Sequence, residues 1–143
     1  MPQLTFTKFT IDAPEHWHDV TAEVDGEAPP VTLVSDEGLG ELQFSVEQLP
    51  GEKPPQLTAE QLRAMLKDFA QAHALGTPRD IAALDSPRPQ LTANFTWDGD
   101  FLRVWYIAEQ NQLAFLTYTC DKKATFASEL QEAEEMILTL RFQ

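Results

Sequence analysis

The fold class is decided by residues 90–120, which read QLTANFTWDGDFLRVWYIAEQNQLAFLTYTC. Residues 90–97 alternate between apolar and polar side chains, which is typical of a half-buried strand. Asp98-Gly99 then supplies a two-residue hairpin turn, because a type I′ turn needs positive φ at both central positions. Residues 101–108 and 113–120 are apolar on both faces. We therefore expect three antiparallel strands in a meander.

The hairpin turn also fixes which side chains share a face of the sheet. With two residues in the loop, Trp97 lies opposite Asp100 and Phe95 lies opposite Leu102. One face then carries Leu91, Ala93, Phe95, Leu102, Val104 and Tyr106, and the other carries Phe101, Arg103, Trp105 and Ile107. Because both faces bear large apolar side chains, both need a cover. We predict an α+β fold, a three-layer α/β/α sandwich with a central antiparallel sheet.

Two amphipathic helices are predicted to provide the cover. The first begins at Thr58, where Thr58 and Gln61 form a capping-box pattern, and ends near Gly76. The second spans residues 124–138, with Asp121 as its N-cap. Their apolar stripes are Leu62, Met65, Leu66, Phe69 and Ala70 in the first, and Phe126, Leu130, Ala133, Met136, Ile137 and Leu140 in the second. Glu129, Glu132 and Glu135 are expected to face water.

The remaining segments are predicted as strands and turns. A turn over residues 12–17 is expected to bring Trp17 back onto the core. Residues 31–35 and 41–47 form a hairpin, in which Leu42, Phe44 and Val46 point inward. The other predictions are a first strand at 4–11, a short strand at 21–23, a loop at 49–56 and an edge strand at 81–84.

Length and charge limit the classes of function. The 143 residues suit a single domain, 1–143. The net charge is −13, which argues against binding to nucleic acid or to an anionic membrane surface. Residues 12–60 alone hold twelve acidic side chains and one base, Lys53. This acidic segment favours either simple solubility or a patch that steers a basic partner.

Cysteine usage and hydropathy bear on location. Cys120 is the only cysteine, so there is no internal disulfide, and its place in a strand pattern favours a small buried hydrophobe. The first ten residues lack the apolar core of a secretory signal, and no segment has the length of a membrane span. We expect a cytoplasmic protein, unless a leader was removed from the sequence.

The order of elements resembles that of a known family. The residues that carry the resemblance are Phe9-Thr10-Ile11-Asp12-Ala13-Pro14-Glu15-His16-Trp17, Arg103-Val104-Trp105-Tyr106-Ile107 and Ala133-Glu134-Glu135-Met136-Ile137-Leu138-Thr139-Leu140. Over nearly its whole length the chain resembles the PsbP-like superfamily, and within it the bacterial DcrB-related domains. The resemblance implies a non-catalytic binding module. Relatives include a photosystem accessory protein, a transport cofactor for a small GTPase, and bacterial proteins of envelopes and of secretion or toxin systems.

Few residues suggest chemistry. His16 and His18, with Glu15 and Asp19 beside them, are a possible metal pair, but a metal site normally draws three or four ligands. There is no nucleophile elbow, no P-loop and no dinucleotide fingerprint. We therefore expect neither an enzyme nor a bound metal or cofactor.

The candidate partner-binding residues fall into two groups. Asp36, Glu37 and Glu41 belong to the acidic segment. Phe101, Arg103 and Trp105 have the composition of a binding hot spot if their face is open, and of a second core if a helix covers it.

Two functions from different classes follow. The first is a non-catalytic protein-interaction module, secretion- or toxin-associated and immunity-like, whose acidic surface faces a basic partner. The alternative is a small-molecule or lipid-binding protein with its pocket between the sheet and one helix, above the Trp105 face. The oligomeric state stays open.

Overall fold

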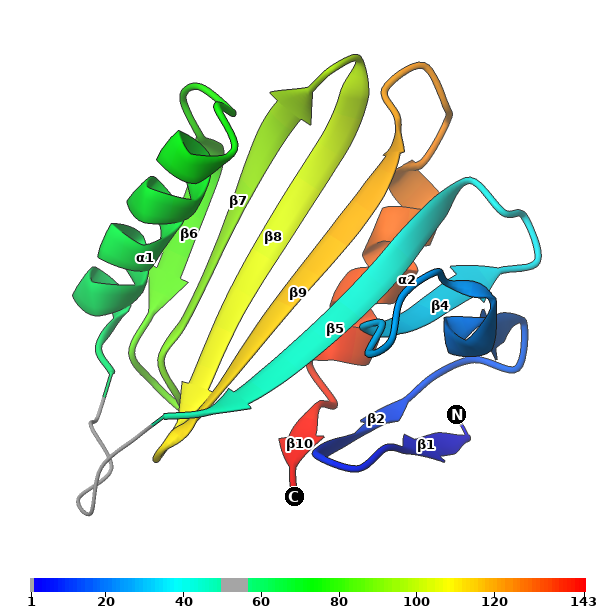
Figure 1. Ribbon diagram of the computed structural model, residues 1–143, viewed down its shortest axis with the longest axis horizontal. Coiled ribbons are helices and arrows are strands. Elements are labelled where there is room, and N and C mark those ends of the chain that lie inside the picture. The colour runs from blue at the N-terminus through cyan, green and yellow to red at the C-terminus, as the bar shows by residue number, and fades with distance from the viewer. Residues whose placement is uncertain (1, 50–56) are drawn as a thin grey trace.

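The computed structural model describes residues 2–49 and 57–143. Within them the fold is α+β with antiparallel sheets (Figure 1). The larger sheet has seven strands in the order β3-β4-β5-β9-β8-β7-β6. Their bounds are β3 Trp17–Asp19, β4 Val31–Ser35, β5 Gly40–Gln48, β6 Arg79–Leu84, β7 Gln90–Trp97, β8 Asp100–Glu109 and β9 Gln112–Asp121.

The predicted meander is confirmed in its register. Phe95 pairs with Leu102 and Trp97 pairs with Asp100. The turn between β7 and β8 has positive φ at both central residues, 50° at Asp98 and 84° at Gly99, as a type I′ turn requires. The side chains of β7 and β8 therefore divide between the two faces as the alternation indicated.

The two helices pack against opposite faces of the sheet. Helix α1, Ala59–Ala72, buries Leu62 and Leu66 in a cluster with Phe95 and Val104. Helix α2, Ala127–Ile137, contributes to a separate cluster on the other face, which includes Trp105 and Leu116. Figure 1 shows α1 in front of β6 and α2 behind β9 and β5. Each helix thus covers one half of one face.

The helix ends agree with the sequence only in part. Thr58 caps α1 as predicted, because its hydroxyl accepts from the Gln61 amide at 3.3 Å and the Gln61 side chain accepts from the Thr58 amide. The predicted end near Gly76 is wrong, since α1 ends at Ala72 and Ala74 adopts positive φ. The predicted N-cap of the second helix is also wrong: the Asp121 carboxylate accepts from the Lys123 amide in a preceding turn, and α2 begins three residues later than expected.

The predicted strand at 4–11 is a hairpin instead. Strands β1, Gln3–Thr5, and β2, Phe9–Asp12, pair with each other, and β2 also pairs with β10, Arg141–Phe142. The Phe6 amide donates to the Phe9 carbonyl at 2.9 Å and closes the turn. The sequence signal was the change of parity between Leu4 and Ile11, which a continuous strand does not tolerate. This small sheet joins the two terminal segments through β2, and the two chain ends lie at its opposite ends (Figure 1).

Most of the remaining predictions hold. Trp17 is buried, β4 and β5 form the predicted hairpin, and β6 is an edge strand. The predicted strand at 21–23 is a 3-10 turn, Thr21–Glu23, because the Asp19 carboxylate accepts from the Thr21 amide and hydroxyl. The predicted loop at 49–56 lies outside the described residues except for Leu49. In the described part of the chain, neither helix has the length and apolar content needed to cross a membrane.

Candidate functional site

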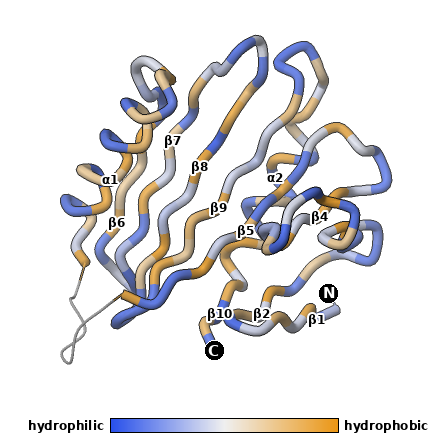
Figure 2. The backbone as a smooth tube through the Cα atoms, in the orientation of Figure 1, coloured by the Kyte–Doolittle hydropathy of each residue, from blue (hydrophilic) through white to orange (hydrophobic). Residues whose placement is uncertain are grey.

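Exposed carboxylates gather at one edge of the seven-stranded sheet. We call this group the acidic edge, and it comprises Glu15, Asp19, Glu23, Asp25, Glu27, Asp36, Glu37 and Glu41. Glu15 precedes β3, Asp19 and Glu41 lie on β3 and β5, and the others lie in the connections on either side of β4. Figure 2 shows these connections as hydrophilic. No lysine or arginine occurs between residues 9 and 49. The segment that forms this edge therefore carries negative charge without an interspersed base.

The predicted acidic residues all lie on this edge. Asp36 and Glu37 occupy the turn after β4, and Glu41 lies on β5 beside Thr119 of β9. All three are exposed. The Asp36 carboxylate contacts His18 Nε2 at 2.5 Å. Glu41 points away from its buried neighbour Leu42, onto the half of the sheet that α1 leaves open.

The predicted aromatic group lies under α2 instead. Phe101 is only 9% exposed and stacks on Phe126, with ring centroids 4.4 Å apart. Trp105 is 4% exposed and donates its ring N–H to Glu134 at 3.2 Å. These residues form a second core rather than an open aromatic surface, because α2 covers their half of the face.

Arg103 lies at the rim of this second core. Its Nε lies 2.5 Å from Glu134, in an ion pair without hydrogen-bond alignment, while its Nη1 donates to Asn94 at 2.9 Å. Glu41 and Arg103 lie on opposite faces, so the six candidate residues do not form one site.

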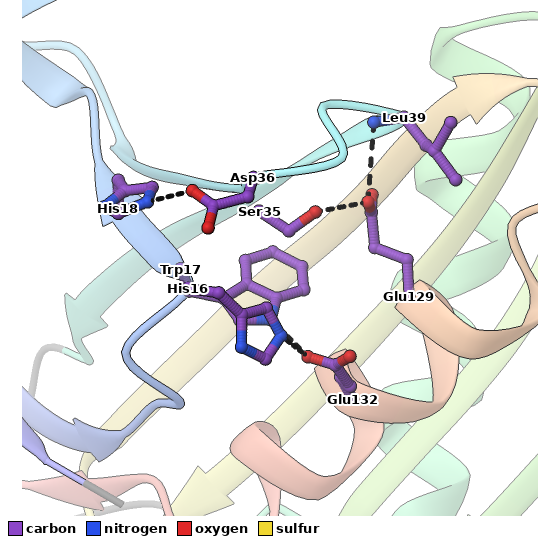
Figure 3. Close-up of polar contacts among 8 residues, drawn as sticks. All are labelled: His16, Trp17, His18, Ser35, Asp36, Leu39, Glu129 and Glu132. Carbon is purple, nitrogen blue, oxygen red and sulfur yellow. Dashed lines mark hydrogen bonds and ion pairs between the residues drawn. The ribbon is translucent and has the colours of Figure 1, made fainter.

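The carboxylate of Glu129, which we expected to face water, links α2 to the sheet (Figure 3). Glu129 is 3% exposed. One carboxylate oxygen accepts from the Ser35 hydroxyl at 2.6 Å and from the Leu39 amide at 3.4 Å. The other accepts from the Gly40 amide and the Tyr118 hydroxyl, both at 2.8 Å. Four neutral donors from two other segments therefore satisfy this charge.

The expectation that Glu129 faces water was wrong, although the sequence held a signal. Glu129 precedes Ala133 by four residues and Met136 by seven, which places it on the buried stripe of α2. Its chemical type argued the other way. Ser35 and Gly40 lie 94 and 89 residues away in the chain, so the spacing alone could not reveal the donors.

The lack of a side chain at Gly40 lets the start of β5 lie close to β9. A Cβ added at Gly40 would lie 2.7 Å from the Thr119 carbonyl oxygen and 2.7 Å from the Tyr118 ring. Because the first contact is with backbone, the strand itself would have to move.

We expect Gly40→Ala to lower the free energy of unfolding by about 1–3 kcal/mol, the usual cost of overpacking. Urea denaturation followed by tryptophan fluorescence measures it. Glu41→Ala, on the next and exposed position of β5, should stay within about 0.5 kcal/mol of wild type. Equal stability of G40A and wild type would contradict the close approach.

Burial also sets the protonation of the groups beside Glu129. Loss of water, reinforced by the hydrogen bond to Glu129, raises the pKa of Tyr118 well above its usual value. Burial is likewise the main cause that raises the pKa of Cys120. Cys120 is buried and remains a thiol, as its strand position predicted.

The two loop histidines contact different carboxylates. His16 and the ring N–H of Trp17 both contact Glu132 of α2, the latter at 2.8 Å (Figure 3). Glu132 is therefore half-buried rather than free in water, and it fastens the turn at residues 13–17 to α2. His18 contacts Asp36 instead. Across the described residues no three His, Cys, Asp or Glu side chains are placed to hold a metal ion.

The backbone is similar to two solved structures. The first is the solution structure of cyanobacterial PsbP (CyanoP) from Synechocystis sp. PCC 6803, with a TM-score of 0.67 and 14% identity over 99% of this chain and 92% of that one. The second is a crystal structure of a protein from Bacteroides thetaiotaomicron VPI-5482, with a TM-score of 0.60 and 18% identity over 94% of this chain and 45% of the other.

The chain therefore has a PsbP-like fold, as the resemblance predicted. At these identities the likeness concerns the fold alone. Neither description mentions DcrB, so that narrower resemblance stays a prediction. No family model and no curated protein sequence matches the chain.

Proposed function

We propose that this protein is a non-catalytic protein-interaction module whose acidic edge binds a basic partner. The observation that carries the proposal is the run of exposed carboxylates from Glu15 to Glu41 without an intervening lysine or arginine. Surface charge of one sign steers a complementary partner and raises the association rate.

The hydrogen bonds of Glu129 favour binding over catalysis. Glu129 is the one carboxylate that is buried among the described residues. Its two oxygens accept hydrogen bonds from four donors of the protein itself. A general acid or base needs a free position facing a substrate. Glu129 thus serves as an attachment between α2 and the β4–β5 turn.

The proposal also covers the arrangement of layers, the location of the protein and the kind of partner. We describe the fold as a three-layer α/β/α sandwich, in which α1 and α2 leave the β4–β5 half of one face open for the partner. We place the protein in the cytoplasm, where a secretion effector or a toxin with a basic surface would be the partner. An immunity-like role would use electrostatic steering to capture such an effector quickly.

We expect the triple variant D36K/E37K/E41K to associate with the partner at least about tenfold more slowly than wild type, because charge reversal removes the steering. Affinity capture from the native host, with wild type and variant as baits, identifies the partner. Stopped-flow mixing at several salt concentrations then measures the association rate, which should fall with salt for wild type only.

A matched control separates local charge from net charge. E60K/E109K/E135K makes the same change in net charge at exposed positions away from the acidic edge. It should retain most of the wild-type association rate. Equal slowing by both triple variants, or a rate that does not depend on salt, would exclude the acidic edge as the docking surface.

The alternative function has one observation in its favour. A hollow of about 280 Å³ lies between α2 and the sheet, lined by Leu84, Thr92, Trp105, Ile137 and Leu138 among others. Leu84 and Leu138 are 53% and 72% exposed. This volume is just below the usual range for small-molecule sites, about 300–1,000 Å³, so we rank small-molecule binding here second.

A further inference from the structure

An apolar groove runs between α1 and the edge strand β6, on the face opposite to the hollow beside α2. Its volume is about 500 Å³. The apolar side chains that line it include Leu66, Ala70, Pro78 and Ile81. Figure 1 shows α1 in front of β6 at the end of the sheet. Because β6 is an edge strand, Ile81 is 40% exposed, and the groove opens to solvent along that side.

Two cations stand on the wall of this apolar groove. Arg63 and Lys67 both line it from α1, and their spacing of four residues places them on one face of the helix. Both are exposed, and neither takes part in an ion pair with any described residue. None of the described lining residues is acidic. The groove thus combines an apolar floor with uncompensated positive charge, in a chain of net charge −13.

We propose that this groove binds a linear acyl carboxylate such as a fatty acid. The acyl chain would lie along Leu66, Ala70 and Ile81, and the carboxylate would contact Arg63 and Lys67. The guanidinium of Arg63 offers the fork geometry that suits a carboxylate, and Lys67 adds a second charge. The volume falls within the range of small-molecule sites. This proposal is independent of the acidic edge, which lies at the other end of the sheet.

The proposal is tested first by the sign of the ligand charge. Backbone amide NMR shifts of the full chain would be followed during titration with dodecanoate and, separately, with dodecyltrimethylammonium. We expect dodecanoate to shift Ala70, Ala74 and Ile81 and to bind at least about tenfold more tightly than the cation. The net charge of −13 favours the cation at non-specific sites, so a preference for the anion must come from the groove.

Variants then assign the two chemical contributions. R63Q/K67Q should weaken dodecanoate binding about tenfold, whereas K122Q/K123Q, which removes the same charge from the exposed turn after β9, should not. Shortening the ligand from dodecanoate to decanoate should weaken binding by about fourfold for each methylene that the groove buries. All four side chains are exposed, so unchanged thermal unfolding of both variants confirms that folding is intact.

Three outcomes would overturn the proposal. They are equal affinity of R63Q/K67Q and wild type, preference for the cationic ligand, and shifts confined to the hollow beside α2. Binding of an acidic peptide but not of dodecanoate at the same residues would replace the fatty acid by a protein segment as the occupant.

Discussion

Replacing Glu129 with alanine is expected to lower the free energy of unfolding by about 3–5 kcal/mol, because the variant leaves a cavity and removes the acceptor of several buried neutral donors. The variant leaves the Ser35 hydroxyl, the Gly40 amide and the Tyr118 hydroxyl without their acceptor. Each unsatisfied buried group costs about 1–3 kcal/mol. Relaxation and entry of water keep the total below the simple sum of these terms.

Urea denaturation of both variants provides the measurement, with Glu135→Ala as the matched control. Glu135 is an exposed glutamate of the same helix, so E135A should stay within about 0.5 kcal/mol of wild type. The pair separates the buried contact from a general effect on helix propensity or net charge. Similar losses for E129A and E135A would show that the four hydrogen bonds contribute little.

A double-mutant cycle sharpens this result. Tyr118→Phe removes a donor but leaves the carboxylate in place, and its loss should be smaller than that of E129A because three other donors remain. In the combined variant the Tyr118 loss should largely disappear, since its acceptor is already gone. Additive losses would indicate that the two side chains contribute independently.

Local rules were sufficient for the meander and for the start of α1. Asp98-Gly99 specifies a two-residue turn, and the turn together with the alternation of residues 90–97 specifies the register that the structure shows. The capping box at Thr58 and Gln61 is equally local. In these places the deciding interactions lie within a few residues of one another, so the sequence pattern contains them.

Interactions between distant segments explain two of the errors, and a local side-chain contact explains a third. Glu129 fits the helical stripe, but three of its four donors lie about ninety residues away in the chain. A burial rule based on charge alone therefore predicts that Glu129 faces water. The N-terminal segment forms two strands, and β2 also pairs with β10 at the other end of the chain, which the local sequence pattern does not show. Residues 21–23 form a 3-10 turn rather than a strand, because the Asp19 carboxylate accepts from the Thr21 amide. The composition of residues 21–23 does not indicate this contact.

The candidate site residues also fall into those that local patterns predict and those that depend on distant packing. Exposed turns and alternate strand positions place Asp36, Glu37 and Glu41 in solvent, as the sequence indicated. For Phe101 and Trp105 the sequence could only pose the question of whether a helix covers them, because the cover depends on where α2 packs. Phe126 and Glu134 provide that cover.

Replacing Trp105 with alanine is expected to lower the free energy of unfolding by about 3–5 kcal/mol, the usual cost of removing a large aromatic side chain from a core. Trp105 is buried among residues of α2 and β9, and it also loses its hydrogen bond to Glu134. The Arg103 guanidinium, 5.5 Å from the Trp105 ring centroid, loses a cation–π contact as well. Guanidinium denaturation followed by far-UV circular dichroism measures the loss.

The control for this variant is Trp97→Ala, because Trp97 lies on the neighbouring strand β7 and is 46% exposed. W97A should cost about half as much as W105A, since nearly half of the Trp97 surface already faces water. The comparison distinguishes the two interpretations of the Phe101, Arg103 and Trp105 group. A residue kept mainly for contact with a partner would lose binding without losing stability, so a W105A variant as stable as W97A would mean that α2 does not cover this face in solution.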